Sequence, residues 1–465
     1  MQNQFKFIIL IIIVAFNGLS QNIDFEKDSI MMRKMYDIAL SKGKAYEDLR
    51  SLCKDVGSRL SGSAQAEMAV VWGKEKLESY NFDTVYLQDI MVPHWERGSQ
   101  ETGWFRVGDE KIQKVNLIAL GGSIATNGLL HGELIMFETR DDLLKASREE
   151  VEGKIVFISQ PMDEKMISTF NAYGGCYPIR GLGAVDAAKL GAKALVIRSL
   201  SLAEHDHPHT GSLRYEEGVN KIPAAALSTN DATLLYNKIK NSDEKVTFSL
   251  ELNCKTHPDK PSHNVVAELR GTKYPNKVIT IGGHLDSWDL GEGAHDDGAG
   301  IVHTMEALRI LKELNYRPNY TLRVVFFMNE ENGNMGGKTY AQLVHEKGEE
   351  HVAAIESDRG GFTPRGFSLD GMDEQLVLLE SFSRLFEPYE VHKFVKGYGG
   401  VDIGPLKEFY PSAALIGFVP DSQRYFDFHH NANDVFENVN KRELELGAAT
   451  ISALLYLLDK YLYLI

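Results

Sequence analysis

The chain has 465 residues, of which 43% are hydrophobic and 25% charged, an ordinary composition that excludes disordered, collagen-like and coiled-coil proteins. At about 100 to 200 residues per domain, this length predicts two or three units, or one large domain that carries an insertion. The net charge of −15 would repel a nucleic-acid backbone and an anionic membrane, so we expect no nucleic-acid partner.

The first twenty residues have the pattern of a secretory signal peptide. Lys6 is the only charge before the apolar run FIILIIIVAF, and the small residues Gly18 and Ser20 precede a cleavage point ahead of Gln21. An uncleaved anchor is the alternative, but this run is shorter than the about 20 residues that a helix needs to cross a bilayer. We predict a signal peptide at 1–20, export to the periplasm or the extracellular space, and no membrane attachment after cleavage.

Residues 21–122 begin with helical patterns and end with β patterns. The stretch from 25 to 82 has the hydrophobic period of helices, most clearly in AEMAVVWGKEKLESYNF, whereas VYLQDIMVPHW and WFRV favour strands. Residues 123–253 differ, because short apolar strands alternate with loops and with one helical segment, GAVDAAKLGA. We predict that 123–253 is a β-rich domain inserted into the first one.

From residue 254 to 465, strands alternate regularly with helices. The predicted strands are KVITIGG, TLRVVFFM, HVAAIES and AALIGFV, and the last helix contains ISALLYLLDKYLYLI. This alternation predicts an α/β domain in which a mixed, largely parallel sheet has helices on both faces. Cys53, Cys176 and Cys254 are too few and too scattered for a disulfide framework, so we expect them to pack in the core.

Side chains that can bind a metal follow four of these strands. In chain order they are His284 with Asp286, Glu330 with Glu331, Asp358, and His429 with His430. In an open α/β sheet, ligands bind outside the carboxyl ends of the strands, so we expect these residues at one rim. Imidazoles and carboxylates without cysteine indicate a catalytic metal centre rather than a structural zinc site.

Two of the short motifs suggest individual roles. His284 and Asp286 lie on the same side of an extended backbone, so one can bind metal while the other braces it. The motif GAHDDGAG supplies Asp296 and Asp297 at the start of a helix near Ala299. We interpret Asp297 as the helix cap and Asp296 as a metal bridge.

The Glu330–Glu331 pair requires a compensating positive charge, since two adjacent carboxylates repel each other. A divalent metal provides that charge, so that one glutamate ligates and the other moves protons. Each short motif also occurs by chance, so the prediction of a metal site depends on the joint order and position of the motifs. Asp402 is interpreted as a turn or cap residue. The HDHPH cluster is interpreted as a solvated or substrate-facing loop.

Together these motifs resemble peptidase family M28, a family of co-catalytic zinc exopeptidases. The family pattern is His-x-Asp, a bridging Asp, Glu-Glu, Asp, and a His four residues before an Asp, which here selects His430 because Asp434 follows it. The resemblance covers nearly the whole mature chain and implies the zinc exopeptidase fold. Segment 123–253 is similar to a protease-associated domain, through GKIVFIS, GAVDAAKLGAKALVIRS and KIPAAALST.

The resemblance implies two zinc ions per chain. The implied ligands are His284, Asp296 and Asp358 for one ion, and Asp296, Glu331 and His430 for the other. Asp286 would orient His284. Glu330 would act as the general base, which takes a proton from water and returns it to the leaving amine.

The implied reaction is hydrolysis of a terminal peptide bond in a small peptide, above all an unblocked dipeptide. A donor for the substrate carboxylate would come from the insertion, where the candidates are His205, His207, His209 and Lys221. An aminopeptidase for longer peptides and a carboxypeptidase are alternatives. A single-zinc glutaminyl cyclase and a non-enzymatic receptor-like ectodomain are rivals from other classes, and a homodimer is left open.

Overall fold

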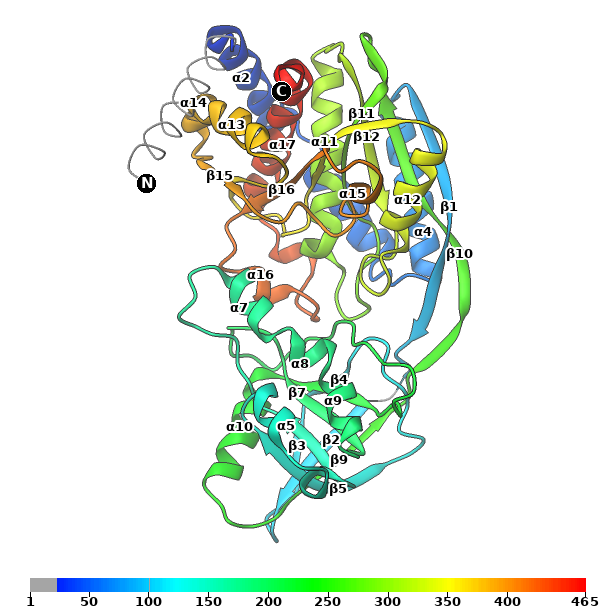
Figure 1. Cartoon of the computed structure of the whole chain (residues 1–465), viewed down its shortest axis with the longest axis vertical. Helices are drawn as coiled ribbons and strands as arrows, with labels where there is room; N and C mark the ends of the chain where they lie inside the picture. Colours follow the sequence, from blue (N-terminus) through cyan, green and yellow to red (C-terminus); the bar gives the residue numbers. More distant parts are fainter. Residues whose placement is uncertain (1–22, 100) are drawn as a thin grey trace, which may run out of the picture.

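The computed structural model describes residues 23–99 and 101–465, so the predicted signal peptide lies outside the described residues. The chain forms two units stacked along its long axis, each built on an eight-stranded sheet (Figure 1). We call residues 23–96 and 255–465 the larger unit, and residues 101–252 the smaller unit. Within the described ranges, no helix is both long enough and apolar enough to cross a membrane.

The sheet of the larger unit is mixed. Its strands lie in the order β1 (Thr84–Glu96), β10 (Lys255–Leu269), β12 (Tyr320–Phe327), β11 (Tyr274–His284), β13 (Glu350–Glu356), β16 (Ala414–Pro420), β14 (Pro364–Asp370) and β15 (Lys393–Lys396). The four central strands β12, β11, β13 and β16 are parallel, whereas β1, β10 and β14 pair in antiparallel fashion with their neighbours towards the centre. The carboxyl ends of the central strands therefore meet at one edge of the sheet.

Helices cover both faces of this sheet, which confirms the predicted α/β class. Because side chains alternate along β12, Val324 and Phe326 pack on one face while Val325 and Phe327 pack on the other. The first face is covered by α2 (Phe25–Lys42), α3 (Ala45–Ser51), α4 (Ala64–Ser79), α11 (Ala299–Glu313) and α17 (Lys441–Tyr461). The second face is covered by α12 (Met335–Glu346) and α15 (Leu406–Phe409).

Shorter elements complete the larger unit. They are η1 (Leu52–Val56), η2 (Ala294–Gly298), α13 (Asp373–Ser381), α14 (Ser383–Phe386), η3 (Glu387–Tyr389), α16 (Tyr425–Phe428), η4 (Phe436–Asn438) and η5 (Leu462–Leu464). Cys53, Cys176 and Cys254 are buried and unpaired, as expected for cysteines that only pack.

The smaller unit has a mixed sheet of its own. Its strands lie in the order β3 (Gln113–Val115), β2 (Glu101–Val107), β9 (Val246–Leu252), β5 (Leu130–Phe137), β6 (Ile155–Ile158), β7 (Ala194–Arg198), β8 (Ala224–Leu227) and β4 (Leu117–Ala119). Its helices are α5 (Arg140–Lys145), α6 (Arg148–Val151), α7 (Thr169–Cys176), α8 (Pro178–Gly181), α9 (Gly183–Lys189) and α10 (Thr229–Lys240). This sheet begins before the predicted boundary at 123, because β2 pairs with β9 and β4 pairs with β8.

A two-stranded ribbon joins the units. β1 and β10 pair from Thr84 and Glu268 to Glu96 and Lys255, and β10 contacts β12 only over 265–269. The remainder of the pair extends beyond the sheet and leads down to the smaller unit (Figure 1). We call residues 91–96 and 255–261 the connecting ribbon.

Arg59 fastens the segment between β11 and η2. Its side chain is fully buried, and its guanidinium donates hydrogen bonds to the carbonyl oxygens of Leu285 at 2.5 Å, Glu292 at 2.6 Å and Gly293 at 2.9 Å. No aliphatic side chain can replace these donors. The segment that carries the Asp296 region therefore depends on a residue from the loop before α4.

We expect Arg59→Met to lower the free energy of unfolding by about 3 to 5 kcal/mol, because it leaves buried carbonyl groups without donors. Urea denaturation followed by tryptophan fluorescence measures the effect. The control is Arg106→Met, which changes an exposed arginine of β2 and should alter stability by less than about 0.5 kcal/mol. Equal stability of the two variants would show that Arg59 does not fasten this segment.

Candidate metal centre

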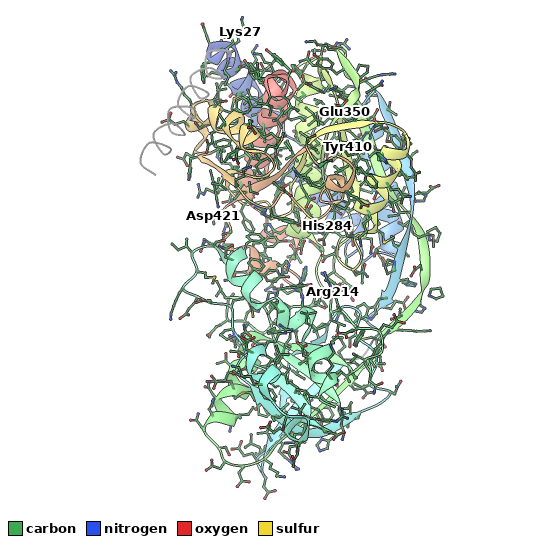
Figure 2. All side chains as sticks on the ribbon, in the orientation of Figure 1. Lys27, Arg214, His284, Glu350, Tyr410 and Asp421 are labelled. Atoms are coloured by element: carbon green, nitrogen blue, oxygen red, sulfur yellow. The ribbon has the colours of Figure 1, made fainter. Side chains whose placement is uncertain are left out.

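The predicted ligands lie at one edge of the larger sheet, just past the carboxyl ends of its central strands. His284 ends β11, Glu330 and Glu331 lie in the turn after β12, Asp358 follows β13, and His430 follows α16. Figure 2 shows His284 at the end of the larger unit that faces the smaller unit. The structure thus brings together side chains that are far apart in the sequence.

Asp296 lies between two groups of these side chains. Its Oδ1 atom is 3.2 Å from Nε2 of His284, and its Oδ2 atom is 3.2 Å from Nε2 of His430. Nε2 of His284 is also 3.6 Å from Oδ1 of Asp358, and Nε2 of His430 is 3.1 Å from Oε2 of Glu331. One carboxylate is therefore shared by two clusters of potential ligands.

Several ligand atoms in these clusters are buried without a hydrogen bond. Among the described residues, Oδ2 of Asp296, Oε1 of Glu331 and Oδ1 of Asp358 have no hydrogen-bond partner. Nε2 of His430 lies 3.2 Å from Oδ2 of Asp296 but is not aligned for a hydrogen bond with that Oδ2 atom. Buried carboxylate oxygens without donors are costly, and metal ions that sit between them remove this cost. The residues present therefore fit two metal ions.

The electrostatics of the cluster favour the same conclusion. Burial raises the pKa of Glu330 well above its usual value, and the nearby Asp358, Glu331 and Asp402 add to this. Burial likewise raises the pKa of Glu331 and of Asp358. The protein itself thus supplies too little positive charge for these carboxylates, and divalent cations would compensate them.

The histidine tautomer can be deduced for His284. Its Nδ1 atom lies 2.9 Å from the backbone carbonyl oxygen of Asp286, which can only accept a hydrogen bond. Nδ1 therefore carries the proton, and Nε2 presents its lone pair to the cluster. This is the form that ligates a metal.

The role predicted for the Asp286 carboxylate needs correction. Its oxygen lies 3.7 Å from Nδ1 of His284, too far for a hydrogen bond, because the backbone carbonyl already occupies that nitrogen. The carboxylate instead accepts hydrogen bonds from the backbone N–H groups of Asn329 at 2.8 Å and Glu330 at 3.0 Å. Asp286 thus fixes the turn that carries the glutamate pair.

Neighbouring acids hold the Asp296 backbone. Asp297 accepts hydrogen bonds from the N–H groups of Gly300 at 3.0 Å and His284 at 3.1 Å, in agreement with its interpretation as a cap. Asp434 accepts from the N–H groups of His295 at 2.7 Å and Asp296 at 3.1 Å. The Asp four residues after His430 therefore positions Asp296.

Asp402 differs from its predicted capping role. It lies in a turn, but its carboxylate is buried and accepts no hydrogen bond from any residue in the described ranges. Its own N–H donates to Oε2 of Glu356 at 2.9 Å, so Glu356 is the residue that caps this turn.

A cavity of about 1320 Å³ opens onto the centre between the two units. Asp296, Glu330, Glu331 and His430 line it from the larger unit. The cationic residues on its walls include Arg180, Arg214, Arg359, Arg365, Lys393 and Lys396. Figure 2 shows Arg214 on the smaller unit, at the end that faces His284. The cavity thus combines an acidic floor with cationic walls.

The substrate contacts predicted in the HDHPH region are wrong in their placement. None of His205, His207, His209 and Lys221, all described residues, lines this cavity. His209 is buried and its Nδ1 atom donates to the carbonyl oxygen of His429 at 2.7 Å, so it supports the His429–His430 segment from behind. His207 and Lys221 are exposed.

Arg180 of α8 occupies the place that the sequence pattern assigned to those residues. Its Nη1 atom lies 3.3 Å from Nδ1 of His430, and its Nη2 atom donates to the hydroxyl of Tyr173 at 2.6 Å. Arg180 was missed, although the donor was expected in the same segment, because it stands in no recognisable motif. Only the packing of the two units brings it to the centre.

Comparisons with known proteins agree with this geometry. The model for "Peptidase family M28" matches residues 264–455, which include all the strand-end ligands. Carboxypeptidase Q of Bos taurus is 34% identical over 419 residues, covering 90% of this chain and 85% of that protein. Carboxypeptidase Q of Homo sapiens shows the same identity and coverage.

Solved structures show the same fold. The crystal structure of a peptidase M28 precursor from Shewanella amazonensis matches with a TM-score of 0.88 and 34% identity, over 93% of this chain and 96% of that one. An aminopeptidase from Aneurinibacillus matches with a TM-score of 0.61 and 22% identity, over 91% and 95% of the two chains. With a third of its sequence shared over nearly its full length with such proteins, this chain belongs to peptidase family M28 and is a metallopeptidase.

Proposed function

We propose that the protein is an exported di-zinc exopeptidase that hydrolyses the terminal peptide bond of small, unblocked peptides. The observation that carries this proposal is the position of Asp296, whose two carboxylate oxygens face the Nε2 atoms of His284 and His430. Export is supported by the signal-peptide pattern at 1–20. A receptor without activity would have no need for this complete set of ligands.

The two zinc ions would be held by the two clusters that share Asp296. One set is His284, Asp296 and Asp358, and the other is Asp296, Glu331 and His430. Bound zinc supplies Lewis acidity, which polarises the scissile carbonyl group and lowers the pKa of water to about 7. Two sets of three ligands favour a di-zinc enzyme over a single-zinc glutaminyl cyclase.

Glu330 is suited to move the proton. It lines the cavity, and its backbone N–H is fixed by the carboxylate of Asp286. A carboxylate in this position can accept a proton from a water molecule that attacks the substrate. Glu330 takes a proton from the attacking water and delivers it to the amine that leaves.

The charges around the cavity select the substrate. The carboxylates of the floor attract a free α-amine, whereas Arg180 and Arg214 on the facing wall attract a free α-carboxylate. A peptide with a free α-amine and a free α-carboxylate a short distance apart can bind the acidic floor and the cationic wall at the same time. The smaller unit covers the cavity and so favours short peptides over folded proteins.

A substrate panel tests this proposal. We expect free dipeptides to have a kcat/KM higher than that of N-acetyl dipeptides by about tenfold or more, because acetylation removes the ammonium charge. Amino-acid amides, which lack the carboxylate, should also be cleaved more slowly than dipeptides. Equal cleavage of acetylated and free dipeptides would instead support a carboxypeptidase, the activity named in the related proteins.

The role of Arg214 in binding the substrate carboxylate can be tested with the same substrate panel. Arg214→Ala should lower kcat/KM for dipeptides but leave the cleavage of amino-acid amides unchanged, because only dipeptides present a carboxylate to Arg214. Arg106→Ala, at an exposed position of the smaller unit, is the matched control. A parallel loss with both substrates would exclude Arg214 as the carboxylate-binding residue.

A further inference from the structure

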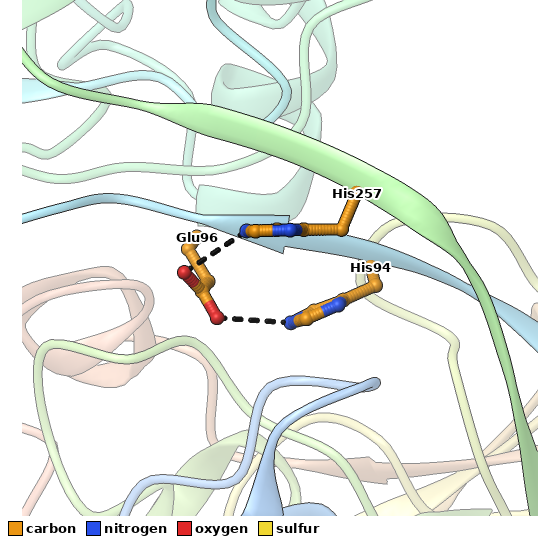
Figure 3. Close-up of side chains that lie close together, drawn as sticks. All are labelled: His94, Glu96 and His257. Carbon is orange, nitrogen blue, oxygen red and sulfur yellow. Dashed lines mark hydrogen bonds and ion pairs between the residues drawn. The ribbon is translucent and has the colours of Figure 1, made fainter.

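Three metal-ligating side chains meet on the connecting ribbon. His94 and Glu96 belong to β1, and His257 belongs to β10 (Figure 3). None of these three described residues lines the cavity of the metal centre. The pairing of the two strands places His94 directly opposite His257, just after a register shift between Val92 and His94.

The three side chains converge on one point. Nε2 of His94 lies 3.1 Å from Oε1 of Glu96, and Nε2 of His257 lies 3.0 Å from Oε2 of the same carboxylate. The two imidazole rings stack, with centroids 4.4 Å apart and an angle of 22° between their planes. His94, Glu96 and His257 each offer one ligand atom, and these three atoms all lie within 4.8 Å of one another.

These distances suit a small tetrahedral ion. Zinc bonds of about 2.0 to 2.2 Å to nitrogen and oxygen place neighbouring ligand atoms of a tetrahedral site about 3.3 Å apart. We propose that His94, Glu96 and His257 form a third zinc site, separate from the catalytic pair. Two imidazoles with one carboxylate suit zinc, whereas calcium and magnesium prefer oxygen ligands.

The surroundings prepare the histidines for ligation. The Nε2 atoms of His94 and His257 both face the carboxylate of Glu96, so each imidazole presents a ligand atom to the same place. The side chain of Glu96 is 57% exposed, so water can reach the fourth position of the ion. Lys260 lies nearby and would oppose a metal, but its ammonium group donates a hydrogen bond to the carbonyl oxygen of Gly62 at 2.9 Å.

A zinc ion here would stiffen the joint between the units. It would tie β1 to β10 beyond the edge of the larger sheet, where the two strands have no third strand beside them over residues 255–261. The ribbon carries the smaller unit, and the smaller unit supplies Arg180 and Arg214 to the cavity. Zinc bound at this site would therefore hold the smaller unit in a fixed position relative to the metal centre.

The ribbon also contacts the turn that precedes α4. A methyl group on Gly62 would lie 2.9 Å from Cβ of His94, so this turn packs directly against the site. The adjacent Ser61 donates a hydrogen bond to Asn332 at 2.8 Å and accepts one from Asn329 at 2.7 Å. Asn329 and Asn332 flank the glutamate pair, so the ribbon site is connected to the catalytic turn.

Metal counting tests the proposal. The purified protein is stripped with chelator, reloaded with zinc, passed through a desalting column and analysed for zinc per chain. We expect Glu96→Gln and His257→Gln to hold one zinc ion fewer than the wild type. The matched control is His263→Gln, because His263 also lies on β10 but faces a single carboxylate, Asp89, at 3.3 Å. This control should hold as much zinc as the wild type.

Cobalt substitution gives a second measurement that does not depend on activity. The visible absorption of the cobalt-loaded wild type should exceed that of His257→Gln by the spectrum of one four-coordinate ion. Equal zinc counts and equal cobalt spectra for these two proteins would overturn the proposal, as would the same loss in His263→Gln. Both measurements compare the variant with the wild type, so their outcome does not depend on how many ions the catalytic centre holds.

Discussion

Glu330→Gln is expected to lower kcat by about 10²- to 10⁴-fold, the usual loss when a general acid–base group is removed. The amide keeps the shape of the side chain but cannot accept the proton of the attacking water. The backbone contact to Asp286 should remain, since it involves only the N–H group of residue 330. Zinc content should therefore be unchanged, which elemental analysis can verify alongside the kinetics.

Glu331→Gln is the matched comparison, because the two residues are neighbours of the same chemical type. Oε2 of Glu331 lies 3.1 Å from Nε2 of His430, so this side chain belongs to one of the two ligand clusters. We expect its substitution to weaken zinc binding as well as activity, with partial recovery of activity at high zinc concentration. Near-normal turnover of Glu330→Gln would assign the general base to another residue.

Chelation is expected to abolish hydrolysis while the larger unit stays folded. The apolar core between the sheet and helices α11 and α17 contains none of the proposed ligands, so its packing does not require a metal. Circular dichroism should therefore retain most of its helical signal when activity is lost. Adding zinc should restore activity.

The His257→Gln variant provides the cleanest stoichiometry, because it lacks the ribbon site. In that variant, activity should return in full only when two zinc ions per chain are bound. Full activity with one ion or fewer would contradict the shared role of Asp296.

Much of the catalytic edge could be predicted from the sequence, because His284, Glu330 and Asp358 stand shortly after strong strand patterns. His284 directly follows KVITIGG and Glu330 follows TLRVVFFM, and parallel strands deliver such residues to one edge. The bridging position of Asp296 depends on contacts with both histidines, and these contacts appear only in the structure.

What the sequence could not predict depends on contacts between remote segments. β2 joins the smaller sheet by pairing with β9, a strand more than a hundred residues later, so local composition could not place the boundary correctly. Arg180 reaches the metal centre only because the units pack together. In the HDHPH segment, His209 was expected to contact the substrate, but it is buried and donates a hydrogen bond to the carbonyl oxygen of His429 instead.

The acidic floor of the cavity comes from the larger unit, whereas Arg180 and Arg214 on its wall come from the smaller unit. This separation affects how the enzyme can evolve. The proposed ligands of the floor would be constrained together by the metal that they hold, whereas Arg180 and Arg214 lie on a short helix and a loop of the smaller unit. Arg214 lines the cavity without a hydrogen bond to these ligands, so substitutions there can change which peptides are accepted, whereas Arg180 and His209 also contact the His429–His430 segment. Exchange of cavity-lining positions such as Arg214 between related enzymes should therefore transfer peptide preference, provided that the contacts of Arg180 and His209 to the catalytic floor are kept.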